Sequence, residues 1–538
     1  MTTSTLSATA VTTLTPYAGE WGAQQAAHLL RRATFAPTKS EIDIAVSLGL
    51  AGTIDELFAV APLPAPPIYF DYDGNPDAGL GQTWVDLAIS SVNNQQDRNA
   101  RRRSYETWLL RSTATTGMKI REKMVFFWLN HFGIGFEQET RALYRMITRF
   151  RENGTGNFRQ LVKDMTIDPL MLRFLNGNTS TRQNPNENFA REILELYTIG
   201  KGPQVAPGDY TTYTELDVTE LAKAFTGWVI RNYNTQTPGE TVYSEFVPNR
   251  HDTTTKTLSV RFGFAEIENA DEVEYANVVD LIFTRDEVAT YICRKLYRQF
   301  VYYTITDDIE ANVIAPMAQI LIDEDYNIAP ALSALLTSEH FFEMKIMGDT
   351  IKSPLEFVHS ILRPTGYYER ETEAAGMLAA RRAFFHCRDT GMDLLNPPSV
   401  AGWTAYYQEP SYYRLWLNTT TIQLRTTFIR DSTVRWHRLS GVRYYVDWLG
   451  LLESFADPFD PNLMIEEMAT RLMPQPLDAA QLTGIKELLL PGLEDFVWTG
   501  EYAEFIANPN DDGLRESVNT RLTEMMFGML QLAEFQVH

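Results

Sequence analysis

The sequence predicts a mainly α-helical protein: one large, irregular multi-helix domain with a small antiparallel β-hairpin inserted near residues 241–264. Three observations predict this class. Apolar residues repeat at helical spacing along most of the 538 residues, one region alternates with strand spacing, and no repeat of about 20–50 residues indicates a solenoid. Hydrophobic residues make up 44% of the chain and charged residues 22%, values that are typical of globular proteins and exclude a disordered or fibrous chain.

Four apolar stripes support the helical prediction. In each stripe the side chains follow one another at intervals of three and four residues, so they line one face of a helix that has to be buried. The stripes run from Leu143 to Phe150, from Phe158 to Met165, from Val288 to Leu296 and from Leu522 to Met529. Thr214 and Asp217 have the spacing of a capping box, so we expect a helix to begin there and run towards Trp228.

Two segments have the strand period instead. In Thr257–Phe264 the apolar side chains occupy every second position, which is typical of a half-buried strand. Thr241–Val247 alternates in the same way, with Thr and aromatic residues. We expect these two segments to pair as the antiparallel hairpin, with His251 and Asp252 in the loop that joins them.

The chain is expected to divide into three parts. Residues 1–19 are predicted to be a flexible tail, residues 20–430 a helical domain with the β insertion, and residues 431–538 a C-terminal helical region packed on the same core. The first residues lack the basic and apolar stretches of a secretory signal, and no apolar run approaches the roughly 20 residues that span a bilayer. A soluble cytoplasmic protein is therefore predicted, with export to the periplasm as the alternative.

Charge and cysteine content exclude several function classes. The net charge of −22, from 47 Lys and Arg against 69 Asp and Glu, argues against binding to nucleic acid or to anionic lipid. Cys293 and Cys387 alone cannot build a disulfide framework or a thiolate zinc cage. The common motifs for nucleophilic serine, metalloprotease and nucleotide chemistry are absent, so no reaction, cofactor or metal site is predicted.

The densest polar cluster lies between residues 184 and 198. Asn184 or Asn186 is placed to cap a helix, on which Asn188, Arg191, Glu192 and Glu195 share one face through spacings of three and four. In a functional interpretation this face is the wall of a binding pocket, with Glu192 or Glu195 as proton carrier and Arg191 as anion clamp. The alternative is a capped helix whose ion pairs are structural.

Further candidates lie in three other segments. His131 sits on an apolar helix, where it is either a general base, a metal ligand or a core histidine with one satisfied hydrogen bond. His251, Asp252 and Lys256 share a loop, where they form either a polar site or an ordinary surface loop. Trp403 belongs to a loop dense in Tyr and Trp, which either binds a ligand, lines an interface or pins the loop to the core.

An ordered series of motifs then resembles the bacterial domain of unknown function 1800 family. The motifs are AAHLLRRATF (26–35), FFWLNHF (126–132), NPNENFAREILELYTIG (184–200), YTELDVTELAKAFTGW (213–228), RHDTTTK (250–256), CRKLYRQFV (293–301), KSPLEFV (352–358), NPPSVAGW (396–403) and WLNTTT (416–421). Their order and spacing cover about residues 20–430, and LAEFQ (532–536) is similar to the family's C-terminus. The long form YYQEPSYYRLWLN resembles Bacteroidetes-type members.

The resemblance implies a mostly helical fold with a small β insertion, and it supplies no settled reaction. By gene association it implies a partner with a sulfatase-like fold, acting on an external polymer or anionic ester, although this chain lacks the signal peptide of exported members. The first functional hypothesis is therefore a binding or accessory protein with a polar pocket. The second is a hydrolase that uses the Glu and His residues above, and the third is an assembly protein that makes contacts through its aromatic loops.

Overall fold

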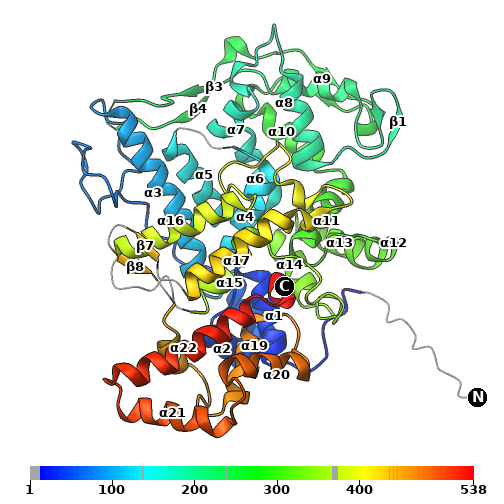
Figure 1. Cartoon of the computed structure of the whole chain (residues 1–538). Coiled ribbons are helices and arrows are strands. Elements are labelled where there is room, and N and C mark those ends of the chain that lie inside the picture. Colours follow the sequence, from blue (N-terminus) through cyan, green and yellow to red (C-terminus); the bar gives the residue numbers. More distant parts are fainter. Residues whose placement is uncertain are drawn as a thin grey trace, which may run out of the picture.

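The computed structural model describes residues 13–538, apart from 136–138, 238, 366–372, 435–436, 440–441 and 445. Helices form most of the described chain, and the strands occur only as short pairs within it. The mainly α-helical fold class predicted from the periodicity is thereby confirmed. In Figure 1 the blue helices of the N-terminal end lie beside the orange and red helices of the C-terminal end, and α1 packs on α19.

The N-terminal third of the chain supplies the first seven helices. They are α1 (Ala23–Ala33), α2 (Lys39–Phe58), α3 (Asn94–Thr115), α4 (Arg121–Phe132), α5 (Thr140–Asn153), α6 (Phe158–Thr166) and α7 (Pro169–Phe174). The stripes predicted from Leu143 and from Phe158 are the buried faces of α5 and α6. Helix α4 is buried nearly all round, because it has apolar side chains on every face.

The middle of the chain supplies the next seven helices, among them α11, which lines the candidate site. They are α8 (Glu187–Glu192), α9 (Glu215–Ala224), α10 (Glu274–Ile282), α11 (Asp286–Phe300), α12 (Asp307–Ile309), α13 (Ala315–Asp323) and α14 (Ile328–Leu336). The capping box of Thr214 and Asp217 opens α9 as predicted. Asn186 caps α8, and the helix continues after Glu192 as a π-helical segment, Ile193–Thr198.

The last part of the chain returns to the first helices. It holds α15 (Pro354–Leu362), α16 (Glu373–Asp389), α17 (Thr419–Thr433), α18 (Trp448–Leu452), α19 (Pro461–Leu472), α20 (Ala479–Leu489), α21 (Asp495–Ala507) and α22 (Asp512–Leu530). Helix α16 runs along α3, and α17 and α18 both contact α22. The helices after residue 430 thus pack on earlier helices of the same fold.

The strands form four antiparallel pairs among the described residues. They are β1 (Gln204–Ala206) with β2 (Asp209–Tyr210), β3 (Trp228–Arg231) with β4 (Tyr243–Phe246), β5 (Lys256–Thr257) with β6 (Glu266–Ile267), and β7 (His437–Leu439) with β8 (Val442–Tyr444). The two segments that we expected to pair with each other therefore pair with other strands. The middle of the predicted second strand is instead a 3₁₀ turn over Val260–Phe262.

Local hydrogen bonds explain this difference. Ser259 accepts a hydrogen bond from the Arg261 N–H, and both its own N–H and its hydroxyl donate to the carboxylate of Asp217 at 2.7 Å. Gly263 then adopts a positive φ of 63°, which ends the turn. These contacts hold the segment as a turn, and Phe264 is left 65% exposed.

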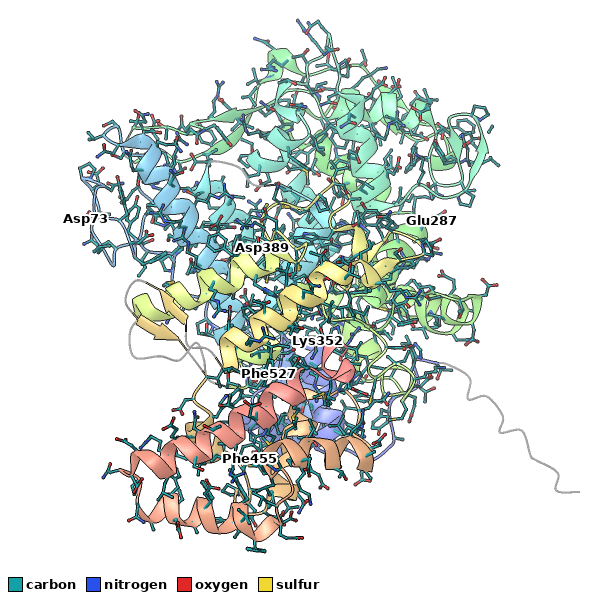
Figure 2. The ribbon with its side chains drawn as sticks, viewed as in Figure 1. Asp73, Glu287, Lys352, Asp389, Phe455 and Phe527 are labelled. Atoms are coloured by element: carbon teal, nitrogen blue, oxygen red, sulfur yellow. The ribbon has the colours of Figure 1, made fainter. Side chains whose placement is uncertain are left out.

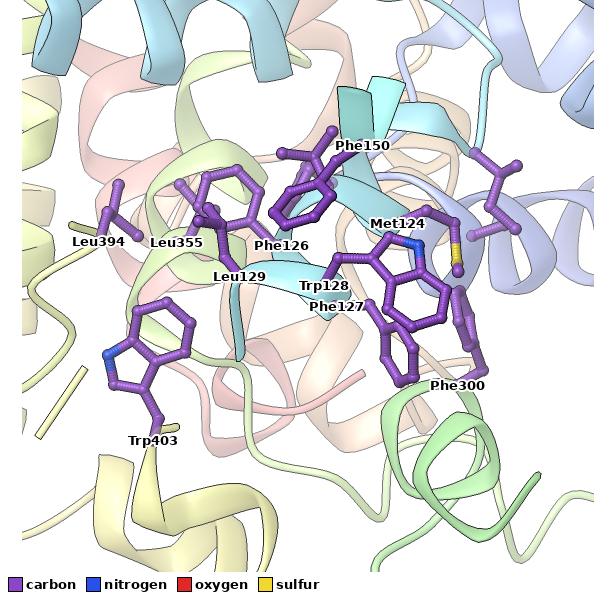
Figure 3. Packing of buried hydrophobic residues seen from close by; sticks show 14 of the residues in the cluster. Met124, Phe126, Phe127, Trp128, Leu129, Phe150, Phe300, Leu355, Leu394 and Trp403 are labelled. Carbon is purple, nitrogen blue, oxygen red and sulfur yellow. The ribbon is translucent and has the colours of Figure 1, made fainter. Parts of the chain in front are cut away.

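The buried apolar side chains form one cluster that extends from Ala26 to Phe535. Figure 3 shows its centre, where Trp128 and Phe127 of α4 lie near Phe300 of α11. At the N-terminal end, residues 1–12 of the predicted tail lie outside the described residues. Residues 13–19 lie against the body of the protein, because the backbone of Tyr17 is hydrogen-bonded to Thr337.

Candidate functional site

A cavity of about 800 Å³ lies between α4 and α11, and this volume is typical of pockets that hold small organic ligands. Its walls also include the loop after the π-helical segment and the aromatic loop at residues 401–407. Glu287, which is labelled in Figure 2 near the start of α11, belongs to this wall. The cavity is therefore assembled from four parts of the chain that are distant in sequence.

The end of α4 brings His131 to the cavity. Directly after the helix, Gly133 has a positive φ of 59° and caps it. A Cβ atom there would overlap the carbonyl oxygen of Val400, so glycine allows the aromatic loop to lie against the helix end. Asn130 holds the same loop, since its Oδ1 accepts a hydrogen bond of 2.8 Å from the Trp403 N–H.

The π-helical segment Ile193–Thr198 presents two backbone carbonyl groups to side chains of α4 and α11. His131 Nε2 lies 3.1 Å from the oxygen of Tyr197. The hydroxyl of Tyr291 donates a hydrogen bond of 3.0 Å to the oxygen of Leu196. Because the last carbonyl groups of a helix have no partners within it, they accept hydrogen bonds from side chains of α4 and α11.

Lys295 of α11 completes this arrangement. Its Nζ lies 3.2 Å from His131 Nδ1 and 3.0 Å from the Leu196 oxygen. The carbonyl of Tyr197 can only accept, so His131 carries its proton on Nε2, and Nδ1 accepts from the amine. Burial, reinforced by the charge of Lys295, lowers the pKa of His131 well below its usual value, so the imidazole is neutral. Burial, together with the nearby Arg298, also lowers the pKa of Lys295 to about 7.

The charges in the cavity wall do not cancel. Within the described chain no carboxylate forms an ion pair with Lys295 or Arg298, whereas Arg294 makes two hydrogen bonds, of 2.6 and 2.9 Å, to Glu310. Lys295 and Arg298 therefore give the cavity a positive field inside a chain whose net charge is −22. A site of this sign, with convergent donors, favours an anionic ligand.

The predicted ligand-binding residues of α8 lie in local structure outside the cavity wall. Asn186 caps the helix by accepting from the Phe189 N–H at 3.0 Å, and Asn188 is exposed. Arg191 makes two hydrogen bonds of 2.6 Å to Glu215 of α9. These contacts join α8 to α9. They correspond to the alternative given above for Arg191, in which the ion pairs of a capped helix are structural.

The two predicted carboxylates lie beside the cavity. Glu195 accepts hydrogen bonds from the Tyr213 hydroxyl at 2.8 Å and from the Lys201 amine at 3.1 Å, and Lys201 itself lines the cavity. Burial, together with the charge of Glu195, raises the pKa of Glu192. The wider π-helical turns after Glu192 change the register, so the single polar face expected on a continuous α-helix is not maintained.

His251 belongs to a second, separate cluster. Its Nδ1 lies 2.9 Å from the carbonyl oxygen of Thr226 and its Nε2 lies 3.1 Å from the carboxylate of Glu274. Lys256 is buried against the same carboxylate at 2.5 Å and donates to the carbonyl of Asp252 at 2.6 Å. Burial lowers the pKa of His251, but these hydrogen bonds outweigh it and raise the pKa above its usual value. None of these residues lines the cavity.

Trp403 is 1% exposed and lies in the core behind the cavity, while its neighbours Tyr406 and Tyr407 line the wall. Sequence reasoning missed the two central cations. Tyr291, Lys295 and Arg298 follow one another at intervals of four and three residues, so they share a helix face. That polar row beside the apolar stripe of α11 is the signal that could have found them.

Comparison with known proteins gives one match. The sequence model of the family described as "Protein of unknown function (DUF1800)" matches residues 28–498. The chain belongs to the DUF1800 family. The His131, Lys295 and Trp403 segments of the cavity all fall within the matched range, so the site is built from the family's part of the chain. No curated protein and no solved structure matches this DUF1800 chain.

Two structural findings accompany this assignment. No helix in the described ranges combines the length and the apolar composition that crossing a membrane requires. In the same ranges, no three His, Cys, Asp or Glu side chains converge in a way that could hold a metal ion.

Proposed function

We propose that this DUF1800 protein binds a small anionic ligand, or the anionic group of a larger polymer, in the cavity between α4 and α11. One observation supports this most strongly: Lys295 and Arg298 line the cavity without carboxylate partners among the described residues. An anion between them would supply the missing countercharge, because charge-assisted hydrogen bonds stabilise buried cations. A carboxylate or a sulfate ester has suitable chemistry.

The proposal includes the accessory role expected from the sequence. A protein that holds a sulfate ester or its product would serve a sulfatase-like partner by retaining an anionic polymer end close to it. The roughly 800 Å³ of the cavity is enough for a monosaccharide-sized group.

Calorimetric titration with inorganic sulfate and with glucuronate tests the proposal. We expect both anions to bind the wild-type protein at about pH 6.5 and to bind Lys295→Met about tenfold more weakly or worse, because a hydrogen bond to a charged group is lost. Lys295→Arg should retain most of the affinity. Lys345→Met, at an exposed lysine that pairs with Glu343, is the matched control and should bind like the wild type. Equal affinity of Lys295→Met and the wild type would contradict the proposal.

Acid–base hydrolysis is the second candidate function. It is favoured by the pair of carboxylates at the edge of the cavity, since burial and the charge of Glu195 raise the pKa of Glu192. Two neighbouring carboxyl groups, one of them with a raised pKa, are a pattern found in general acid–base catalysis. A Glu192→Gln protein that folds normally and hydrolyses sulfated or glycosidic model substrates as fast as the wild type would remove this candidate.

A further inference from the structure

The position of Lys295 supports a covalent role in addition to charge pairing. The amine lies in the wall of the cavity, on α11, and its two hydrogen-bond partners among the described residues are both acceptors: His131 Nδ1 at 3.2 Å and the Leu196 oxygen at 3.0 Å. Its Nζ also lies 4.8 Å from the centroid of the Tyr291 ring. An amine nitrogen is tetrahedral, so one bond to carbon and two hydrogen bonds leave one direction without a hydrogen-bond partner. In the neutral amine that direction holds the lone pair.

We infer that the Lys295 amine forms a reversible imine with the carbonyl carbon of an anionic aldehyde or ketone bound in this cavity. This inference rests on the proposed function, because the cavity must first hold the anion. Arg298 lies one helical turn further along α11 and also lines the cavity, so it is placed to pair with the carboxylate or sulfate of such a ligand.

The groups around the Lys295 amine are suited to the proton transfers that imine formation requires. His131 is neutral and presents the lone pair of Nδ1 to the amine, so it can accept a proton as the nitrogen attacks. The charged groups that line the cavity together with Lys295 are Lys201, Glu287, Arg294, Arg298 and Glu310. Both acids of this set are paired with arginines, Glu287 with Arg285 and Glu310 with Arg294, so neither holds the amine in its charged form.

The reaction balances without a further reactant. The Lys295 nitrogen forms a bond to the carbonyl carbon, and the carbon–oxygen π bond opens to give a carbinolamine after one proton passes from nitrogen to oxygen. The remaining carbon–oxygen bond then breaks as the nitrogen lone pair forms the C=N bond. The second amine proton passes to the hydroxyl oxygen, which leaves as water. A pKa near 7 provides the unprotonated amine that the first step needs at neutral pH.

Reductive trapping tests the inference. The full-length protein is incubated with glyoxylate and cyanoborohydride, and the labelled lysines are located by peptide mass spectrometry. We expect Lys295 to gain a carboxymethyl group about tenfold faster than exposed Lys345, with a rate that rises as the pH passes through about 7, and we expect sulfate to slow it. Labelling of Lys295 no faster than Lys345 would overturn the inference.

The Lys295→Arg protein separates this inference from the proposed function. An arginine retains the charge but forms no imine under these conditions, so the variant should still bind sulfate while the label disappears from position 295. A wild-type protein that binds sulfate but is not trapped at Lys295 disproves the imine and leaves anion binding intact. A wild-type protein that binds neither sulfate nor glyoxylate disproves the proposed function itself.

Discussion

We expect Lys295 to lower the free energy of unfolding at neutral pH, because its amine is buried. Burial, together with Arg298, lowers its pKa from the usual 10.5 to about 7 in the folded state. Between these two values the unfolded chain binds more protons than the folded chain, so the Lys295 contribution to the free energy of unfolding rises with pH from about 7 upwards. Below about pH 7 the cost of the buried charge is present in full.

The stability of Lys295→Met as a function of pH tests this point. We expect the variant to melt at a higher temperature than the wild type at about pH 6, and the difference to shrink towards about pH 9. Thermal unfolding of both proteins is measured across that pH range. The difference between their melting temperatures removes the contribution of all other titrating groups. A difference that is constant with pH would show that the amine has an ordinary pKa.

The charged groups of the cluster around Glu274 are paired with one another. Unlike Lys295, they are therefore expected to stabilise the fold. His251 and Lys256 both contact this carboxylate in the core. We expect Glu274→Gln to lower the free energy of unfolding by about 3–5 kcal/mol, since it leaves Lys256 buried without a countercharge. Denaturant unfolding measures the loss, and sulfate binding at the cavity should be unchanged in the protein that remains folded.

For His251 the sign of the pH dependence follows from its raised pKa. Its stabilising contribution is present in full below about pH 6.5 and is lost as the pH rises through the higher pKa of the folded state. A His251→Gln protein should therefore differ most from the wild type at low pH. A difference in stability between His251→Gln and the wild type that widens as the pH is raised would contradict a His251 ring that is protonated on both nitrogens.

At the scale of elements, the close contact between α4 and the aromatic loop determines the shape of the cavity. Gly402 has a positive φ of 89°, and a Cβ atom there would overlap the carbonyl oxygen of Asn130. We expect Gly402→Ala to lower the free energy of unfolding by about 2 kcal/mol or more and to weaken sulfate binding, because the loop must move away from the helix end. Gly484, in the middle of α20 with open space at its Cβ position, is the control. Gly484→Ala should be neutral or stabilise by up to about 1 kcal/mol.

The sequence predicts helices well where a local signal is clear, as with the capping box at Thr214 and the apolar stripe along α11. Prediction from the sequence fails where contacts between residues that are distant in the chain determine the local structure. The turn at Val260 depends on Asp217, which lies more than forty residues earlier and binds Ser259. The π-helical segment likewise depends on partners from α4 and α11, so the register of Glu195 could not be derived from local spacing.

The candidate site was predictable only in part for the same reason. His131 could be singled out from an apolar helix in which it is an unusual residue. Local spacing does not distinguish Lys295 from an ordinary solvated cation beside an apolar stripe. Its contact with His131, which is 164 positions away in sequence, depends on the fold. Sequence spacing within one helix therefore identifies a polar face but does not show what that face meets.

At the scale of the whole molecule, the buried cluster joins both ends of the chain. Helix α22 lies beyond the part that matches the family and contributes buried Val518, Leu522, Met525, Met526, Met529 and Leu530. Lys352 also donates a hydrogen bond of 2.7 Å to the carbonyl of Phe535.

A chain that ends after Trp498 should therefore fail to fold. Each buried apolar side chain of α22 contributes about 1.5–3 kcal/mol, and together they rival the net stability of a typical domain. Circular dichroism during heating measures the outcome, with the full-length chain as control. A soluble fragment that unfolds cooperatively at the wild-type temperature would show that the C-terminal helices are dispensable.

Proton uptake on sulfate binding tests the central claim most directly. An anion held by Lys295 raises the pKa of that amine, so binding at about pH 7 should draw about half a proton from the buffer. Calorimetry in two buffers of different ionisation enthalpy measures this number. We expect uptake by the wild type and none by Lys295→Arg, which binds without titrating. Sulfate binding with no proton uptake, or with the same uptake in both proteins, would contradict a cavity in which Lys295 holds the anion.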